Sequence, residues 1–295
     1  MMHGLRKRTT AKSGSNKQGQ ISSTLIMILP GFILFAFFYV MQDGMIFYNV
    51  NDPQSREFLQ NRPGFYEIAF TAGNNKNYHG MMYRAAKEKS PLVIYFGGNG
   101  ECSYRHMRNI EAQNLWPYYA GFNYLYVDYD GYGFNDGRTN FRNMYEGALA
   151  AYDYAVTLPN VDPERIVAMG FSLGTGSAVY LAANRPVAGL ILAAPYANGY
   201  GLYNNVLPIF YGPMKLLVRQ KLPSDEYAPK VTSPVLIIAS RNDEIIPFSS
   251  SEQLSKLFSG GVDFIELLNV YHNDIFRAEG VLNRVQYFLE GVASD

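Results

Sequence analysis

The sequence of 295 residues predicts an α/β fold with a mainly parallel sheet of about eight strands and helices on both faces. Short apolar runs bounded by turn-forming residues alternate with longer runs at helical spacing, and this alternation is typical of a parallel sheet covered on both sides. With 48% hydrophobic and 17% charged residues, a chain of this length can bury one large core. A single α/β domain is therefore sufficient.

The strand-like runs are expected at 65–71, 78–84, 92–96, 124–129, 166–171, 188–194, 235–240 and 264–268. The helix-like runs are expected at 103–116, 141–157, 174–183, 249–258 and 273–289. Between two of the later strands, the segment 197–232 is rich in apolar and aromatic residues. Two interpretations remain open for it: a cap over a binding site, or an ordinary crossover helix packed on the sheet.

The N-terminal region is expected to anchor the chain in a membrane. Residues 1–20 form a polar tail with five basic residues and no acid, and residues 21–41 are apolar and uncharged. Because a membrane-spanning helix needs about 20 apolar residues, the stretch is long enough to cross a bilayer. A cleaved signal peptide is the rival interpretation, but no A-x-A-like site follows. Lys and Arg stay on the cytoplasmic side, so the linker 42–64 and the catalytic domain 65–295 are expected on the periplasmic, extracellular or lumenal side.

Charge and motifs exclude several classes of function. Beyond the basic tail, the chain holds 20 basic and 25 acidic residues, a net charge of −5, which argues against nucleic-acid binding because that binding neutralises phosphates. Neither a dinucleotide fingerprint nor a phosphate-binding loop is complete, and H-E-x-x-H does not occur. The single cysteine, Cys102, excludes a cysteine zinc cluster and an internal disulfide. We expect no cofactor, no metal and a monomer.

The most informative motif is G-x-S-x-G at residues 170–174. The apolar strand 166–171 runs into it and a helix-like run follows, which is the layout of a nucleophile elbow. A serine hydroxyl is a weak nucleophile until a neighbouring base takes its proton, and a sharp strand-to-helix turn exposes it to both base and substrate. Since the motif alone occurs by chance in roughly one such chain in ten at ordinary glycine usage, its context must support it.

That context is the order of residues along the chain. Hydrolases built on this elbow have Ser, then Asp or Glu, then His. Of four histidines only His272 follows Ser172, so it is the candidate base, although a surface histidine at a helix start would also fit. Asp243 lies in the loop that follows the apolar strand 235–240, three residues after its end, and is the candidate acid, with Glu244 as the fallback. The carboxyl ends of parallel strands share one edge of the sheet, so the three side chains are expected to meet there.

Backbone N–H groups near this edge are candidates for an oxyanion hole, which stabilises the tetrahedral intermediate. The N–H of Leu173 directly follows the nucleophile, and the N–H of Asn99 lies in a glycine-rich loop after the strand 92–96. Read alone, this loop is equally well an ordinary glycine turn. Substrate contacts are expected from Gly98, Tyr196 and Phe210.

Five fragments resemble those of the membrane-anchored α/β-hydrolase-domain proteins, which include bacterial serine-aminopeptidase-like hydrolases and eukaryotic bud-emergence-type relatives. These fragments are 95–100, 127–133, 170–174, 227–230 and 271–274. The resemblance implies an α/β-hydrolase fold after one transmembrane helix, the triad Ser172, Asp243 and His272, and oxyanion donors at Leu173 and Asn99. This chain departs from the family at two positions: Gly97 replaces a usual His, and Asp130 replaces a usual Arg.

The sequence thus predicts a single-pass, membrane-anchored serine hydrolase that cleaves ester or thioester bonds of a small-molecule or lipid substrate. Carboxylesterase, lipase-like and acyl-thioesterase activities all fit this prediction. A serine peptidase on short peptides is the enzymatic alternative. A non-catalytic interaction module is the alternative from another class, although such modules usually lack a triad member.

Overall fold

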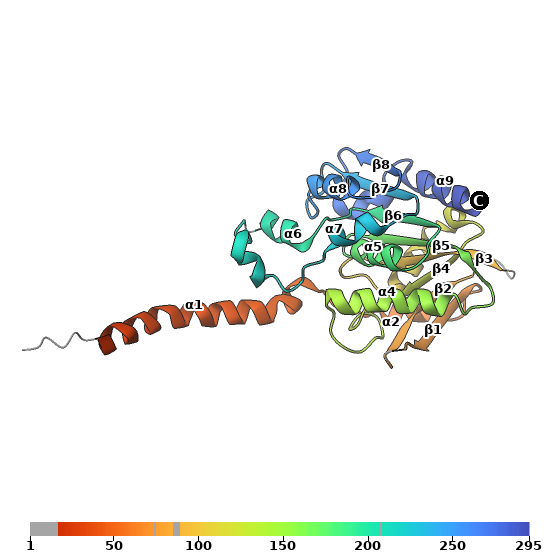
Figure 1. Ribbon diagram of the computed structural model, residues 1–295. Helices are drawn as coiled ribbons and strands as arrows, with labels where there is room; N and C mark the ends of the chain where they lie inside the picture. Colours follow the sequence, from red (N-terminus) through yellow and green to blue (C-terminus); the bar gives the residue numbers. More distant parts are fainter. Residues whose placement is uncertain (1–16, 74, 85–88, 207, 295) are drawn as a thin grey trace, which may run out of the picture. The chain divides into compact units, whose positions relative to one another are not determined.

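The structure is a computed structural model that describes residues 17–73, 75–84, 89–206 and 208–294 (Figure 1). The chain divides into two compact units, residues 1–41 and 42–295. The first contributes most of helix α1 (Lys17–Ile46), which continues through Pro30. In the described part of the chain, no helix combines the length and the apolar character needed to cross a membrane. Most of the predicted tail, residues 1–16, lies outside the described residues, and so do the side chains of residues 21–28, 34 and 38 in the predicted span.

Within its described residues, the second unit contains an eight-stranded sheet with the order β1-β2-β4-β3-β5-β6-β7-β8. Strand β2 runs antiparallel to both of its neighbours, and every other neighbouring pair is parallel, which confirms the predicted, mainly parallel sheet. The strands are β1 (Phe65–Thr71), β2 (Asn77–Tyr83), β3 (Ser90–Phe96), β4 (Asn123–Val127), β5 (Val161–Phe171), β6 (Gly189–Ala193), β7 (Val235–Ser240) and β8 (Val262–Leu267).

Helices cover both faces of this sheet. Helices α4 (Phe141–Ala155) and α5 (Gly174–Asn184) pack against each other on one face (Figure 1). Successive residues of strand β5 face opposite sides of the sheet. A Cβ on Gly170 would contact the start of α5, whereas Met169 and Phe171 line a cavity on the other face. That second face carries α3 (Ser103–Ala112) and α9 (Val281–Ser294), while α2 (Pro53–Leu59) packs on α3 and α8 (Phe248–Ser255) on β7.

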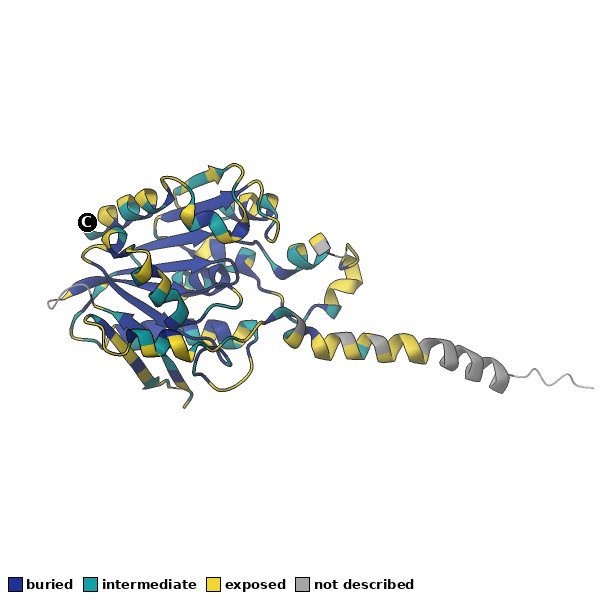
Figure 2. Cartoon of the chain, turned by 180° about the vertical axis from the view of Figure 1, so that it is seen from behind, coloured by how far each residue is buried: buried dark blue, intermediate teal, exposed yellow. Residues whose placement is uncertain are grey.

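The core lies along the central strands. Every residue of β3, β4, β6 and β7 is buried, and these strands form the dark centre of Figure 2. Continuous apolar runs of this kind are expected where a parallel sheet is covered on both faces. The core is also rich in tyrosine, and a buried tyrosine usually finds a hydrogen-bond partner for its hydroxyl. The fully buried tyrosines are Tyr78, Tyr95, Tyr124, Tyr126, Tyr132 and Tyr196.

The predicted helix at 273–289 is wrong in its first part. Residues His272–Arg277 form a 3-10 turn, η4, and α9 begins only at Val281. Gly280, with a φ of +77°, lies directly before α9 and breaks the helical path. A positive φ is easily adopted only by glycine, so Gly280 separates the two elements.

The segment predicted as cap or crossover, residues 197–232, has two parts. Helix α7 (Ser224–Tyr227) and the 3-10 turn η3 (Ala228–Lys230) pack on α5, as a crossover does. The preceding part contains α6 (Gly199–Val206) and the 3-10 turn η2 (Gly212–Leu217), and every residue of η2 lies at least partly exposed. Each interpretation therefore describes one part of the segment.

Candidate active site

Ser172 lies on a sharp turn between β5 and α5, with a φ of +50°. This is the left-handed region, which non-glycine residues adopt only where the surrounding structure imposes it. The close approach of strand and helix requires the flanking glycines. A Cβ on Gly174 would lie 2.0 Å from the Phe96 carbonyl oxygen, and one on Gly170 would lie 2.7 Å from the Gly174 carbonyl oxygen. The two glycines thus permit the turn that presents the Ser172 hydroxyl.

The three predicted triad side chains lie in one hydrogen-bonded row. The distance from Ser172 Oγ to His272 Nε2 is 2.9 Å, and that from His272 Nδ1 to Asp243 Oδ2 is 2.7 Å. The side chains of His272 and Asp243 are each only 3% exposed. An ionised Asp243 accepts the Nδ1 proton, which leaves Nε2 free to accept the proton of the serine.

The carboxylate of Asp243 is fixed by its own loop. Its Oδ1 accepts hydrogen bonds from the N–H groups of Ile245, at 2.9 Å, and Ile246, at 2.7 Å. The two carboxylate oxygens therefore have separate functions, since Oδ1 holds the loop and Oδ2 faces the imidazole.

Glu244, the fallback acid, binds the backbone of the histidine instead of its ring. Its Oε2 accepts the N–H of His272 at 3.0 Å. Two further bonds join the same loops, from Ser240 Oγ to the Val270 carbonyl at 2.6 Å and from the Asn269 N–H to Asn242 Oδ1 at 2.8 Å. Three hydrogen bonds thus join the loops after β7 and β8, and they fix the position of Asp243 relative to His272.

Asp274, two residues after His272, has a surface partner. It pairs with Arg277 at 3.0 Å within η4, and both side chains are about half-exposed or more. This geometry directs its carboxylate toward Arg277, whereas Asp243 is the carboxylate at the imidazole.

The loop of residues 97–100 lies next to the nucleophile. A Cβ on Gly98 would lie 3.6 Å from the Cβ of Ser172 and 2.9 Å from the Phe171 ring, so a larger residue would fill the space beside the serine. In the described ranges, no protein group accepts the N–H of Asn99 or of Leu173. These two donors are the ones that the sequence predicts for an oxyanion hole.

A partly buried carboxylate, that of Glu101, holds this loop in place. Glu101 accepts the N–H of Gly98 at 2.7 Å and the hydroxyl of Tyr95 at 3.2 Å. Burial opposes ionisation of Glu101, but the neighbouring His106 and the Gly98 N–H outweigh it and lower the pKa of this carboxyl. Because its N–H is bonded to Glu101, Gly98 is held in place and is not a free donor.

The side chain of Asn99 has a role that no sequence pattern indicates. Its Oδ1 accepts the hydroxyl of Tyr132 at 2.6 Å and the N–H of Tyr48 at 2.9 Å. Its Nδ2 donates to the carbonyl of Ile46 at 2.6 Å. Asn99 thus fastens the loop to a segment about fifty residues earlier in the chain.

Gly97, where the family resemblance predicts a histidine, has no room for a side chain. A Cβ there would lie 1.8 Å from the hydroxyl oxygen of Tyr126. The carbonyl of Gly97 accepts the hydroxyl of Tyr129 at 2.9 Å. Tyrosines on and after β4 therefore occupy the space beside residue 97.

Two residues predicted to bind substrate lie in the interior. Tyr196 is fully buried, and its hydroxyl donates to the Leu173 carbonyl at 3.0 Å, so it stabilises the turn that carries Ser172. Phe210 is buried against Tyr203 in the segment 197–232, and its N–H donates to Asn204 Oδ1 at 2.8 Å. Contact of either residue with substrate stays a prediction.

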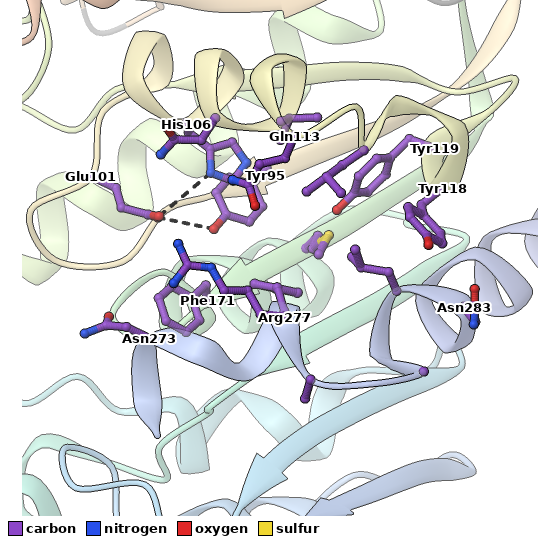
Figure 3. A pocket seen from close by; sticks show the side chains of 18 of the residues that line it. Tyr95, Glu101, His106, Gln113, Tyr118, Tyr119, Phe171, Asn273, Arg277 and Asn283 are labelled. Atoms are coloured by element: carbon purple, nitrogen blue, oxygen red, sulfur yellow. Dashed lines mark hydrogen bonds and ion pairs between the residues drawn. The ribbon is translucent and has the colours of Figure 1, made fainter. Parts of the chain in front are cut away.

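A cavity of about 500 Å³ lies between α3 and the η4–α9 region (Figure 3). Phe171 lines it, and the same ring packs against the His272 imidazole with centroids 5.0 Å apart. Glu101 and His106 line its opposite wall. Across the described ranges, no three His, Cys, Asp or Glu side chains are arranged to hold a metal ion, and the expected absence of a metal stays a prediction.

Solved structures share this fold at low sequence identity. An esterase from Pyrococcus furiosus has a TM-score of 0.64 and 15% identity, covering 83% of this chain and 98% of the esterase. Acetyl xylan esterase 1 from Thermoanaerobacterium has a TM-score of 0.59 and 19% identity, covering 77% of this chain and 83% of that enzyme. At such identities the likeness is one of fold.

Sequence relatives lie closer. A family model described as the dienelactone hydrolase family matches residues 136–272, which include all three members of the hydrogen-bonded row. The human alpha/beta hydrolase domain-containing protein 17C is 28% identical over 229 residues, covering 76% of this chain and 65% of the human protein. An uncharacterized protein of Mycobacterium tuberculosis is 34% identical over 208 residues, covering 69% of this chain and 71% of its own length. The chain therefore belongs to the same family as the mycobacterial protein, and its fold is the α/β-hydrolase fold.

Proposed function

We propose that this chain is a serine hydrolase that cleaves ester or thioester bonds through an acyl-enzyme on Ser172. The observation that supports this most is the row of two hydrogen bonds, 2.9 Å and 2.7 Å long, that links Ser172 through His272 to Asp243. A serine on a strained turn with a histidine and a buried carboxylate behind it is the arrangement that activates a hydroxyl for acyl transfer.

In the proposed reaction, Ser172 Oγ attacks the substrate carbonyl carbon while His272 Nε2 takes the hydroxyl proton. Asp243 stabilises the resulting imidazolium, and the N–H groups of Leu173 and Asn99 bind the oxyanion. The imidazolium then gives its proton to the leaving alcohol or thiol as the bond to the carbonyl carbon breaks. Water attacks the acyl-enzyme with His272 again acting as base, which releases the acid and restores the serine.

We also propose that residues 21–41 anchor the enzyme in a bilayer, with the N-terminus on the cytoplasmic side. The support comes from charge. Residues 18–42 contain no charged residue and follow a tail with five basic residues and no acid. Such a tail stays on the cytoplasmic side, so the hydrolase unit faces the periplasm, the outside or a lumen.

The test is activity-based labelling of the full chain in membranes with a fluorophosphonate, which reacts with activated serines. We expect labelling of the wild type and of the exposed-serine control Ser249→Ala, and none of Ser172→Ala. Removing such a nucleophile lowers kcat by a factor on the order of 10⁶. Activity on p-nitrophenyl esters and acyl thioesters, compared with that on aminoacyl p-nitroanilides, then separates esterase from peptidase. A Ser172→Ala variant that retains more than a few per cent of the activity contradicts the proposal.

A further inference from the structure

An apolar surface is exposed on the segment between β6 and β7. Within a short stretch, four large apolar side chains are strongly exposed: Ile209 (44%), Tyr211 (60%), Met214 (42%) and Leu216 (81%). We call these four residues the cap surface. Single exposed apolar residues are ordinary, but several together on one small element indicate a surface that binds something apolar.

The segment that carries the cap surface contains basic residues but no acidic ones. Residues 197–223 contain Lys215, Arg219 and Lys221 and no acidic residue, although the chain after its N-terminal tail is acidic on balance. Lys215 and Lys221 are exposed, whereas Arg219 pairs with Asp43 at 3.3 Å. An apolar surface with exposed lysines beside it fits a bilayer with anionic head groups, because the lysines meet the phosphates while the apolar side chains enter the interface.

The segment that carries the cap surface is hydrogen-bonded to the first residues of the hydrolase unit, Gln42 and Asp43. Gln42 Nε2 donates to the Leu217 carbonyl at 2.5 Å, and Gln42 Oε1 accepts the N–H of Arg219 at 2.9 Å. The next residue, Asp43, accepts from Gln220 Nε2 at 2.5 Å. Gln42 is itself buried, so these contacts are part of the packed unit.

These hydrogen bonds determine how far the cap surface lies from the membrane in which the chain is anchored. Gln42 directly follows the apolar stretch 21–41 in the chain. If that stretch ends at the lipid surface, residue 42 lies in the head-group layer, and the residues that bind it must lie at the same level. The hydrogen bonds between residues 42–43 and residues 217–220 therefore favour a bilayer over a soluble protein as the partner of the cap surface.

We infer that the cap surface docks on a bilayer containing anionic lipid, with Leu216 and its apolar neighbours at the level of the head groups. The inference goes beyond hydrolysis by Ser172, and it rests on the proposed anchor for the position of the cap. Docking would hold the segment next to the source of a lipid substrate. Docking would also bury the apolar side chains of the cap surface, which are exposed in the described part of the chain.

The test uses the full chain in vesicles of phosphatidylcholine and phosphatidylglycerol, with a bimane fluorophore on an introduced cysteine. Leu216→Cys reports on the cap surface, Tyr287→Cys on α9 is a control of similar exposure (73%), and Phe37→Cys reports on the anchor. The native Cys102 is buried, and burial raises the pKa of its thiol to about 11, so it stays largely unlabelled. Nitroxide-bearing lipid quenches only fluorophores near the bilayer.

We expect nitroxide lipid to quench bimane at residue 216 at least about twofold more than at residue 287, since interfacial side chains enter the head-group boundary. Replacing Lys215 and Lys221 by Gln, or omitting phosphatidylglycerol, is expected to reduce the quenching at 216. Equal quenching at 216 and 287 overturns the inference. If bimane is quenched at residue 37 but not at residue 216, the anchor is supported and the docking inference is wrong. If bimane is quenched at neither residue, both the anchor and the docking inference are wrong.

A second copy of the chain is the other occupant that the experiment detects. In that case bimane at residue 216 is shielded from aqueous iodide but is not quenched by nitroxide lipid, and the lipid inference is overturned. Hydrolysis gives an independent reading. The variant Leu216→Ser is expected to keep its activity on a soluble p-nitrophenyl ester and to lose at least about tenfold on an ester presented in vesicles, because only the second requires docking.

Discussion

Asn99 binds Ile46 through its side chain: the Nδ2 group donates to the Ile46 carbonyl at 2.6 Å. The backbone N–H of the same residue is one of the two proposed oxyanion donors. The loop beside Ser172 is therefore fastened to the segment that enters the hydrolase unit. We expect the geometry of the proposed oxyanion hole to depend on this attachment, because a donor contributes only when it points at the position of the developing charge.

Replacing Asn99 by Ala is expected to lower kcat by about tenfold to a hundredfold with little change in KM, because a misplaced oxyanion donor weakens transition-state binding alone. Tyr132→Phe removes one of the three bonds of the Asn99 side chain and is expected to have a smaller effect in the same direction. Steady-state kinetics on a p-nitrophenyl ester provide the measurement. A normal kcat in Asn99→Ala would show that the attachment does not position the donor.

Two aspartates compete for the role of orienting the base, and they are expected to differ widely. Asp243→Asn should lower kcat by about 10⁴, because an amide at this position stabilises the wrong tautomer of His272. Asp274→Asn should change kcat less than about twofold, since its partner is the exposed Arg277, and surface pairs of this kind contribute little. The catalytic efficiencies of the two variants settle the matter, and the reverse ranking would transfer the role to Asp274.

Stability is expected to depend on pH through Asp128. This carboxyl is buried after β4 and accepts both the N–H and the hydroxyl of Ser103 at 2.7 Å, and burial raises its pKa from 3.8 to about 7. Between these values the folded state holds a proton that the unfolded chain releases. The free energy of unfolding should therefore fall as pH rises from about 4 to 7, by at most about 1.4 kcal/mol per pH unit from this group.

The matched variant for this effect is Asp128→Asn, which carries no titrating proton. Urea unfolding of the full chain in detergent at pH 5 and pH 8 gives the comparison. The wild type should lose more stability than the variant between the two pH values. Parallel losses in the two proteins would show that Asp128 does not carry the dependence.

The proposed topology predicts a pattern of protease protection. An N-terminal tag should remain on the same polypeptide as the hydrolase unit and sediment with membranes through a carbonate wash. Protease added to intact cells, or to spheroplasts where an outer membrane exists, should digest the hydrolase unit and spare the tag. A soluble mature protein without the tag would identify residues 21–41 as a signal peptide, and a protected hydrolase unit would place the active site in the cytoplasm.

The sheet could be predicted because its strands are continuous apolar runs, which parallel strands covered on both faces require. The row of Ser172, Asp243 and His272 could be predicted because each follows a strand and their order along the chain is restrictive. The side-chain role of Asn99 could not, since its partners Ile46 and Tyr48 lie about fifty residues away with no local pattern to mark them. The late start of α9 depends on Gly280, whose φ cannot be read from a helical pattern.

Gly97 and Tyr126 limit each other's size. A histidine introduced at residue 97 alone has no space, since its Cβ would lie 2.6 Å from Cζ of Tyr126 and still closer to the hydroxyl. Tyr126 must first become smaller, and that step leaves a void in the core until residue 97 fills it. A larger residue at 97 thus requires a second change at 126, and that second change is destabilising by itself. The glycine at residue 97, in the loop beside Ser172, is therefore required by a tyrosine on β4.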